Sequence, residues 1–423
     1  MPNRDIMILL IVFVLVYVSC KAQSERSDIL TIDIESAAEN LEVLSLSQYA
    51  DSIWYITMES DDLLLRNLRL LDKRDHLLLV SDMNEIVLFS DQGEFLSKIG
   101  TRGRGPEEYK YINNVRLSLN GTIFVQDQYD LLEYDINGRH LGSFKNFFRP
   151  DSYTGCSREW IQLDDSLFLL HLPIVLGDEE YRAVIRDRQG SFVQYITNYN
   201  HFKNEVKSSD SWSTAASVYT FEQRIFYNEM LIDTLYELDS SFNLVPRFHF
   251  NRGKYYISYL EIVNSLFDQT FGDFPKAYIQ FVFETQGYML FDIEFFINEL
   301  KLPVIVYEDG HPTKYVTTKL LGVYDKNSDH FLVAEPNRDG EYGIRRTGLV
   351  NDIDGGFSFY PTARFGDNTL AMQIDVLKLK RYVDSEGFRE TLALYPAKKR
   401  ALEELANSLT EESNPVLMVV RMK

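Results

Sequence analysis

The sequence has little of what metal binding, covalent catalysis or nucleic-acid binding requires. It contains two cysteines, Cys20 and Cys156, and seven histidines, which are scattered and form no His-Glu-x-x-His motif. It has no Gly-x-Ser-x-Gly segment, so it offers no nucleophile elbow. Lysine and arginine number 43 against 63 aspartates and glutamates, which gives a net charge of −20. Because phosphate contacts need clustered cations, we expect no nucleic-acid partner.

An apolar run covers residues 6–19, after Arg4 and directly before Cys20. Its length matches the apolar region of a secretory signal and is short for a membrane-spanning helix, with a short anchor or a buried helix as the alternative. The ending Val-Ser-Cys resembles the lipobox of bacterial lipoproteins, which implies lipidation of Cys20. Cys156 then has no partner for an intramolecular disulfide. We expect a signal peptide over residues 1–19, a polar tether over 20–27 and one domain over 28–423.

Aromatic residues are abundant, with 26 Tyr, 28 Phe and 3 Trp, and such residues favour half-buried strands. Residues 67–100 and 114–146 form a repeat with a period of about 45 residues. The repeat pairs Phe89 with Tyr134 and Gly93 with Gly138. Each unit has short apolar runs separated by turns, and Asn137-Gly138 is a strong hairpin signal. Each unit is therefore predicted to be a small antiparallel meander.

Meanders at near-regular spacing predict an all-β fold, a six-bladed β-propeller of four-stranded antiparallel blades. Weaker copies of the unit follow the first two, and the final segment, residues 415–423, is expected to close the ring beside an N-terminal strand. Two segments have helical spacing instead, at about residues 257–271 and 395–410, and are expected to be short helical insertions. Asp127, Asp135, Asp187 and Asp239 stand near predicted strand ends, where turn capping accounts for them.

The segment Gly-Thr-Arg-Gly-Arg-Gly-Pro-Glu-Glu-Tyr at residues 100–109, with the second repeat, resembles a family of exported six-bladed propeller lipoproteins of Gram-negative gut anaerobes. This family is distantly similar to NHL-repeat propellers. Residues 232–255, residues 348–356 and the C-terminal segment resemble later motifs of the same family. The resemblance implies a propeller anchored by lipid at the outer membrane. It implies no particular reaction, since a shared fold does not select a function.

Residues 100–109 are also the first candidate binding site. Their glycines allow the backbone to approach a ligand, and Arg102 and Arg104 could hold a carboxylate or phosphate beside Tyr109. No Gly-Lys-Ser/Thr ending follows, so the segment is not a P-loop. The alternative is a crossover between blades, in which the arginines pair with Glu107 and Glu108 while Tyr109 packs inside.

A second candidate site contains Asn351, Asp352 and Asp354, followed by two glycines. The pattern is superficially like the start of a calcium loop, but it lacks the bidentate glutamate and helix pair of an EF-hand. An Asx-rich turn is the simpler interpretation, and a Ca²⁺ site that borrows carboxylates from other blades is the alternative. No other cofactor is predicted, and the metal content is left open.

These observations favour a binding or scaffolding lipoprotein of the cell envelope. Its partners would be the outer membrane, through the lipid on Cys20, and a glycan, a peptide or an envelope protein. The alternative is a metal-dependent hydrolase or lyase with its site in the propeller channel, because propeller enzymes assemble ligands from distant strands. The polar side chains that line the channel would discriminate between the two hypotheses.

Overall fold

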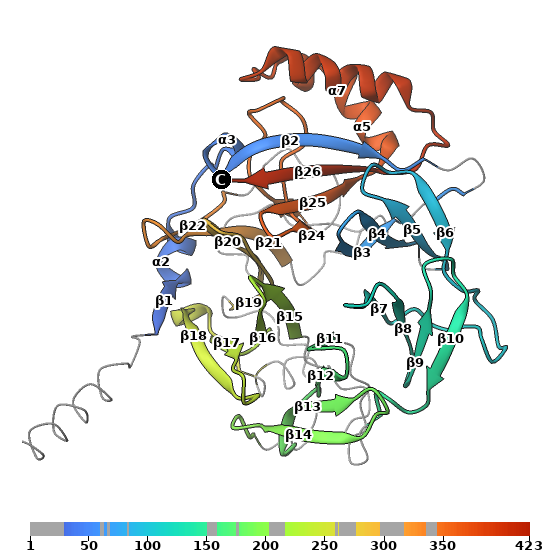
Figure 1. Cartoon of the computed structure of the whole chain (residues 1–423). Coiled ribbons are helices and arrows are strands. Elements are labelled where there is room, and N and C mark those ends of the chain that lie inside the picture. The colour runs from blue at the N-terminus through green and yellow to red at the C-terminus, as the bar shows by residue number, and fades with distance from the viewer. Residues whose placement is uncertain are drawn as a thin grey trace, which may run out of the picture.

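The computed structural model describes residues 29–59, 63–65, 68–82, 84–149, 159–174, 177–202, 216–258, 261, 276–296, 317–335 and 345–423. These residues form six antiparallel sheets arranged in a ring (Figure 1). The six-bladed propeller predicted from the sequence is therefore confirmed. The predicted signal peptide and tether, Cys20 and Cys156 lie outside the described residues.

Three blades follow one another in the first half of the chain. The first comprises β3 (Arg69–Arg74), β4 (Leu77–Ser81), β5 (Ile86–Ser90) and β6 (Phe95–Lys98). The second comprises β7 (Asn114–Leu117), β8 (Ile123–Asp127), β9 (Asp130–Tyr134) and β10 (His140–Phe144). The third comprises β11 (Trp160–Gln162), β12 (Leu167–His171), β13 (Tyr181–Asp187) and β14 (Phe192–Thr197). In each blade the first strand is nearest the centre of the ring (Figure 1).

Two larger blades follow, and each carries an added strand. The fourth comprises β15 (Ala216–Phe221), β16 (Arg224–Glu229), β17 (Thr234–Leu238) and β18 (Leu244–Asn251), to which β1 (Leu30–Asp33) adds in parallel. The fifth comprises β19 (Lys276–Glu284), β20 (Tyr288–Phe296), β21 (Thr317–Asp325) and β22 (His330–Val333), with β23 (Arg345–Thr347) parallel to β21. A 3-10 turn, η1 (Gly253–Tyr255), follows β18.

The sixth blade joins the two ends of the described chain. Its inner strands are β24 (Ala363–Gly366), β25 (Thr369–Ile374) and β26 (Val416–Met422), and its outer strand is β2 (Ala50–Thr57). β2 and β26 pair antiparallel from Ala50 with Met422 to Thr57 with Val416. The C-terminal strand thus closes the ring beside an N-terminal strand, as predicted.

The first two repeats are equivalent in three dimensions. Gly93 and Gly138 occupy the turns before β6 and β10 with φ values of +90° and +81°. A Cβ on Gly93 would lie 1.9 Å from the Thr57 carbonyl oxygen, and one on Gly138 would lie 2.0 Å from that of Lys98. Both glycines therefore abut the outer strand of the preceding blade, where a side chain has no room.

Aspartates in three of these outer turns accept backbone hydrogen bonds. Asp135 accepts from the N–H groups of Asn137 and Arg139 at 3.0 and 2.9 Å. Asp187 and Asp239 accept the corresponding pairs of bonds in the next two blades. These bonds lower the pKa of Asp135 and of Asp239. Turn capping, the interpretation made from the sequence, accounts for all three residues.

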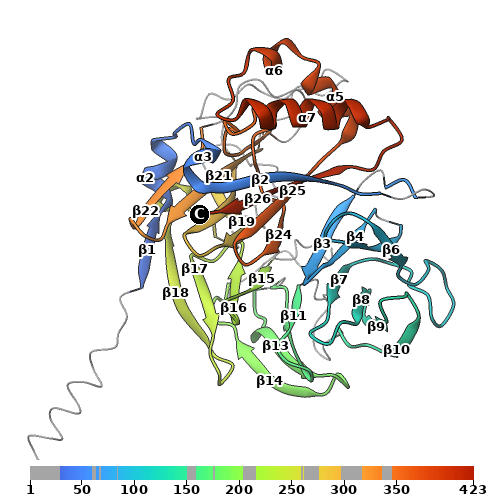
Figure 2. The same ribbon diagram turned by 45° about the horizontal axis from the view of Figure 1, so that its top comes forward.

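The predicted helix over residues 395–410 is confirmed as α7 (Pro396–Ser408). Two further helices, α5 (Val376–Val383) and α6 (Glu386–Glu390), precede it, and two short ones, α2 (Ile34–Glu39) and α3 (Leu46–Tyr49), lie near the N-terminal strands. Helices α5 to α7 gather beside the sixth blade (Figure 2). Leu402 and Ala406 of α7 join Leu379 of α5 in the core that also contains β26 residues.

The other predicted helical insertion, residues 257–271, lies outside the described residues except for residues 257, 258 and 261. Within the described part of the chain, every helix is too short or too polar to cross a membrane.

Closure by β26 predicts the effect of removing it. Deletion of residues 415–423 takes away the strand between β2 and β25, leaves two buried edges unpaired and should abolish cooperative melting by circular dichroism. Val419→Pro should cost about 3 kcal/mol or more in free energy of unfolding, because it removes a buried ladder N–H. Glu412→Ala, in the exposed turn before β26, is the control. An unchanged melting temperature in the truncated chain would contradict the closing role of β26.

Candidate functional site

A cavity of about 1480 Å³ occupies the centre of the ring. Residues from the first strands of all six blades, β3, β7, β11, β15, β19 and β24, line it. Figure 1 shows these strands around the middle of the propeller. A cavity of this size exceeds what a small ligand needs.

The lining carries charges of both signs. Its basic residues are Arg69, Lys73, Arg74, Arg116 and Arg364, and its acidic residues are Asp72, Glu159, Glu222, Asp292 and Asp367. Two large apolar side chains, Leu119 and Phe281, are about two-fifths exposed, at 43% and 41%. Charged and apolar side chains thus share the lining of the channel.

One charged cluster connects the first three blades. Arg116 on β7 lies between Asp72 on β3 and Glu159, which directly precedes β11. The Arg116 Nη2 and Glu159 Oε2 atoms are 3.6 Å apart, and Asp72 Oδ2 accepts the Leu117 N–H at 2.9 Å. Burial raises the pKa of Asp72 and of Glu159, while attraction to Arg116 partly opposes both shifts.

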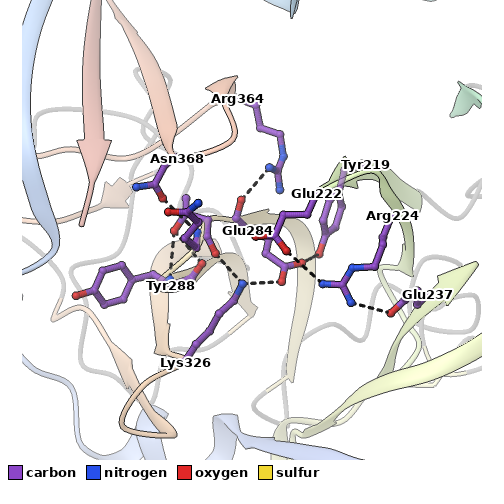
Figure 3. Close-up of polar contacts among 11 residues, drawn as sticks. Tyr219, Glu222, Arg224, Glu237, Glu284, Tyr288, Lys326, Arg364 and Asn368 are labelled. Carbon is purple, nitrogen blue, oxygen red and sulfur yellow. Dashed lines mark hydrogen bonds and ion pairs between the residues drawn. The ribbon is translucent and has the colours of Figure 1, made fainter. Parts of the chain in front are cut away.

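A second cluster joins the fourth, fifth and sixth blades (Figure 3). Glu284 accepts hydrogen bonds from the Tyr219 hydroxyl at 3.0 Å and from Lys326 Nζ at 2.7 Å. Arg364 donates from Nη1 to the Glu284 carbonyl oxygen at 2.8 Å, and its guanidinium lies 4.7 Å from the centre of the Tyr219 ring. Burial lowers the pKa of Arg364, but an arginine so placed still keeps its proton at neutral pH.

The first site predicted from the sequence lies away from this cavity. Arg102 is exposed and donates to Asn84 Oδ1 at 2.5 Å and to the Lys110 carbonyl at 3.2 Å. Arg104 is exposed, whereas Tyr109 is buried in the core between the first two blades, where burial raises its pKa to about 12. Glu108 accepts the Gly105 N–H at 2.7 Å. The segment is a crossover between blades with Tyr109 packed inside, and a ligand on its arginines stays a prediction.

The second predicted site is a buried turn. Asn351 and Asp354 are 3% and 1% exposed, and Asn351 Nδ2 donates to Asp354 Oδ1 at 2.6 Å. Asp354 also accepts from the Gly356 N–H at 2.8 Å and from the Tyr55 hydroxyl at 3.0 Å. Asp352 accepts from the backbone and hydroxyl of Ser47. The three polar side chains therefore hold this turn together and tie it to β2 and to α3, and Ca²⁺ binding there stays a prediction.

The sequence did not single out the residues that line the channel. Arg74, Arg116 and Arg364 belong to no local motif, and each lies on the first strand of a different blade. The available signal was a charged residue within a short inner strand, which is visible only once blade boundaries are known. Among the described residues, no group of three or more His, Cys, Asp or Glu is placed to hold a metal ion.

The turn around Asp354 predicts a stability effect. Asp354→Ala leaves Asn351 Nδ2, the Gly356 N–H and the Tyr55 hydroxyl without their acceptor, and buried donors in this state are costly. We expect a loss of about 2 kcal/mol or more in the free energy of unfolding, measured by urea denaturation. Asp165→Ala, at an exposed turn, should change it by less than about 0.5 kcal/mol. Equal effects of the two variants would show that the turn is not held by Asp354.

Comparisons with known proteins agree with this fold. A solved structure from Bacteroides fragilis, of a protein named for its supposed export, is 21% identical, with a TM-score of 0.63 over 93% of this chain and 99% of that one. A member of the DUF4221 family from Bacteroides vulgatus is 13% identical, with a TM-score of 0.43 over 67% of this chain and 95% of that one. Virginiamycin B lyase from Staphylococcus aureus is 7% identical, with a TM-score of 0.34 over 67% and 87%. The last two scores are too low to support a functional inference.

No curated protein matches the sequence. A family model does match, over residues 29–421, which is nearly the whole described chain. The chain belongs to the family defined by the domain of unknown function DUF4934.

Proposed function

We propose that the chain is an exported lipoprotein, held in the cell envelope by a lipid on Cys20, and that its propeller binds a ligand in the central channel. The ligand would be a glycan, a peptide or a segment of an envelope protein. The observation that carries this proposal is the wide cavity lined by charged side chains from all six blades. The name of the Bacteroides fragilis neighbour, which refers to export, is consistent with it.

The charge of the chain gives a reason for the anchor. A net charge of −20 disfavours electrostatic binding to anionic lipid headgroups. Lipid at Cys20 would hold the propeller at the membrane, most simply the outer membrane, without such attraction, and the short segment before β1 would keep the two close. Attachment and ligand binding would then be separate properties of separate segments.

The carboxyl groups of the channel favour a second function, a hydrolase or lyase acting at the same place. Burial raises the pKa of Asp72 and of Glu159, and a carboxyl whose pKa is raised beside a cavity is a candidate general acid. Arg116 between them could stabilise negative charge in a reacting ligand. The support for this candidate comes from these side chains and not from a metal site.

The anchor is tested by Cys20→Ser. In cells that express the full chain, this variant should lose incorporation of a labelled fatty acid and move from the membrane fraction to the soluble fraction. Cys156→Ser is the matched control and should keep both properties. Retention of the Cys20→Ser variant in membranes at the level of the parent chain would contradict lipid anchoring.

Channel binding is tested by narrowing the cavity. Asn113 lines the channel, and Asn113→Trp should weaken retention of any ligand found in a glycan and peptide screen by about tenfold or more, because an indole occupies the binding volume. Asn407→Trp, on the exposed face of α7, should bind like the parent chain. Both variants should keep the parent melting temperature.

The same screen separates the two functions. Retained but chemically unchanged ligand supports a binding module. Turnover that is lost in Asn113→Trp and kept in Asn407→Trp would favour the enzyme. Equal retention by both variants would place the ligand outside the channel and contradict the proposal.

A further inference from the structure

Three arginines that line the channel each keep a buried nitrogen with no hydrogen-bond acceptor among the described residues. The atoms are Nε of Arg74, Nε of Arg116 and Nη2 of Arg364. A buried donor without a partner lowers the stability of the folded protein, and more so when the group is charged. These atoms are themselves closed to solvent, but the Arg116 side chain is 27% exposed where it lines the cavity, so the same guanidinium can donate to an acceptor that enters.

The geometry of two of these arginines suits a carboxylate. Arg364 is fixed by its hydrogen bond to the Glu284 carbonyl and by the Tyr219 ring beneath it (Figure 3). Arg116 is fixed through Glu159. Guanidinium groups bind carboxylates through two parallel N–H bonds, and groups that are already positioned lose less entropy when the ligand arrives.

The acidic side chains of the lining further limit the kinds of ligand that can bind. Asp72 and Glu159 flank Arg116, so a densely charged polyanion would meet repulsion beside its own binding group. A sugar hydroxyl both donates and accepts, so it can bond to a carboxylate and to the side-chain amides of Asn113 and Gln223. A ligand with many hydroxyls and well-separated carboxylates therefore matches a lining in which Arg116 lies between Asp72 and Glu159.

The apolar part of the lining can also accommodate a sugar. Phe281 presents a ring that is 41% exposed, onto which the C–H face of a sugar can stack. The lining also contains partly buried apolar residues such as Leu71, Ile112 and Ile161, so the apolar surface is compatible with a sugar, and the oligoglutamate comparison below separates a sugar from a peptide. The volume of about 1480 Å³ has room for more than one sugar unit.

We infer that the channel binds an oligosaccharide that carries carboxylate groups, with Arg116 and Arg364 holding the carboxylates. This inference rests on the proposed binding function and specifies its ligand. It assigns the two arginines, on β7 and β24, as specificity-determining residues for the acidic sugar.

The test is calorimetric titration of the purified mature chain with a panel of short uronic-acid oligosaccharides of differing linkage. The comparison ligands are the same oligosaccharides after reduction of their carboxyl groups, and oligoglutamate peptides. We expect binding of at least one acidic oligosaccharide, and binding of its reduced form that is weaker by about tenfold or more. Raising the salt concentration should weaken the first interaction more than the second.

Variants locate the interaction. Arg116→Gln and Arg364→Gln should each weaken binding of the acidic oligosaccharide by about tenfold, with little effect on its reduced form. Arg224→Gln is the matched control, because Arg224 lies in the same polar network but pairs with Glu222 and Glu237. Its affinity should stay within about twofold of the parent chain. Arg116→Lys keeps the positive charge but lacks the planar guanidinium, so it should bind the acidic oligosaccharide with intermediate affinity. This variant tests the inference if a glutamine variant proves unstable.

The outcomes separate this inference from the proposed function. Equal binding of acidic and reduced forms, or equal loss in the Arg224 and Arg116 variants, would overturn the inference. Tighter binding of oligoglutamate, or no binding across the acidic panel, would also overturn it. In those cases the proposed channel function would still hold if a different ligand bound to the parent chain and failed to bind to Asn113→Trp.

Discussion

The pairing of β2 with β26 is the interaction on which the rest of the structure depends. These strands lie at opposite ends of the described chain, and their eight-residue and seven-residue spans bring the ends together in one blade. The central cavity exists only when the ring is closed, since its wall takes one strand from each blade. Arg364 belongs to the closing blade but bonds to the fifth blade and stacks on the fourth. The position of a channel arginine is therefore set by the closure of the ring.

The sequence predicted those parts of the fold that local interactions determine. The turn glycines Gly93 and Gly138 repeat because each packs on the outer strand of the blade before it. The turn aspartates repeat because each caps a short outer turn through backbone bonds within a few residues. Helix α7 was visible because its apolar residues follow helical spacing, whereas α5 and α6 are short and were not singled out. Turns and helices of this kind can be recognised in the sequence because a few neighbouring residues determine them.

The channel could not be predicted in the same way, because its chemistry is assembled across the ring. Arg116 and Glu159 are 43 positions apart in sequence, yet their charged groups are 3.6 Å apart. Nothing near either residue marks it as facing a cavity. The segments that did look functional, residues 100–109 and 351–356, owe their glycines, aspartates and asparagine to tight turns and buried hydrogen bonds. Turn chemistry and ligand chemistry use the same residue types, so a single sequence does not distinguish them.

The charges of the channel are better explained by binding than by stability. A buried ion pair is often no more stabilising than apolar side chains of the same volume, because both groups lose their hydration. The interfaces between the blades show that this chain can fill such space with apolar residues, as around Phe147, Phe148 and Phe168. The first strands place arginines and carboxylates at the centre instead, and leave guanidinium nitrogens there without acceptors among the described residues. The buried nitrogens lower the stability of the free protein, while the Arg116 side chain, which is 27% exposed, stays open to a ligand in the cavity. Charged side chains held at a cavity in this way are what the proposed binding function requires, because they can pair with a ligand without first being ordered.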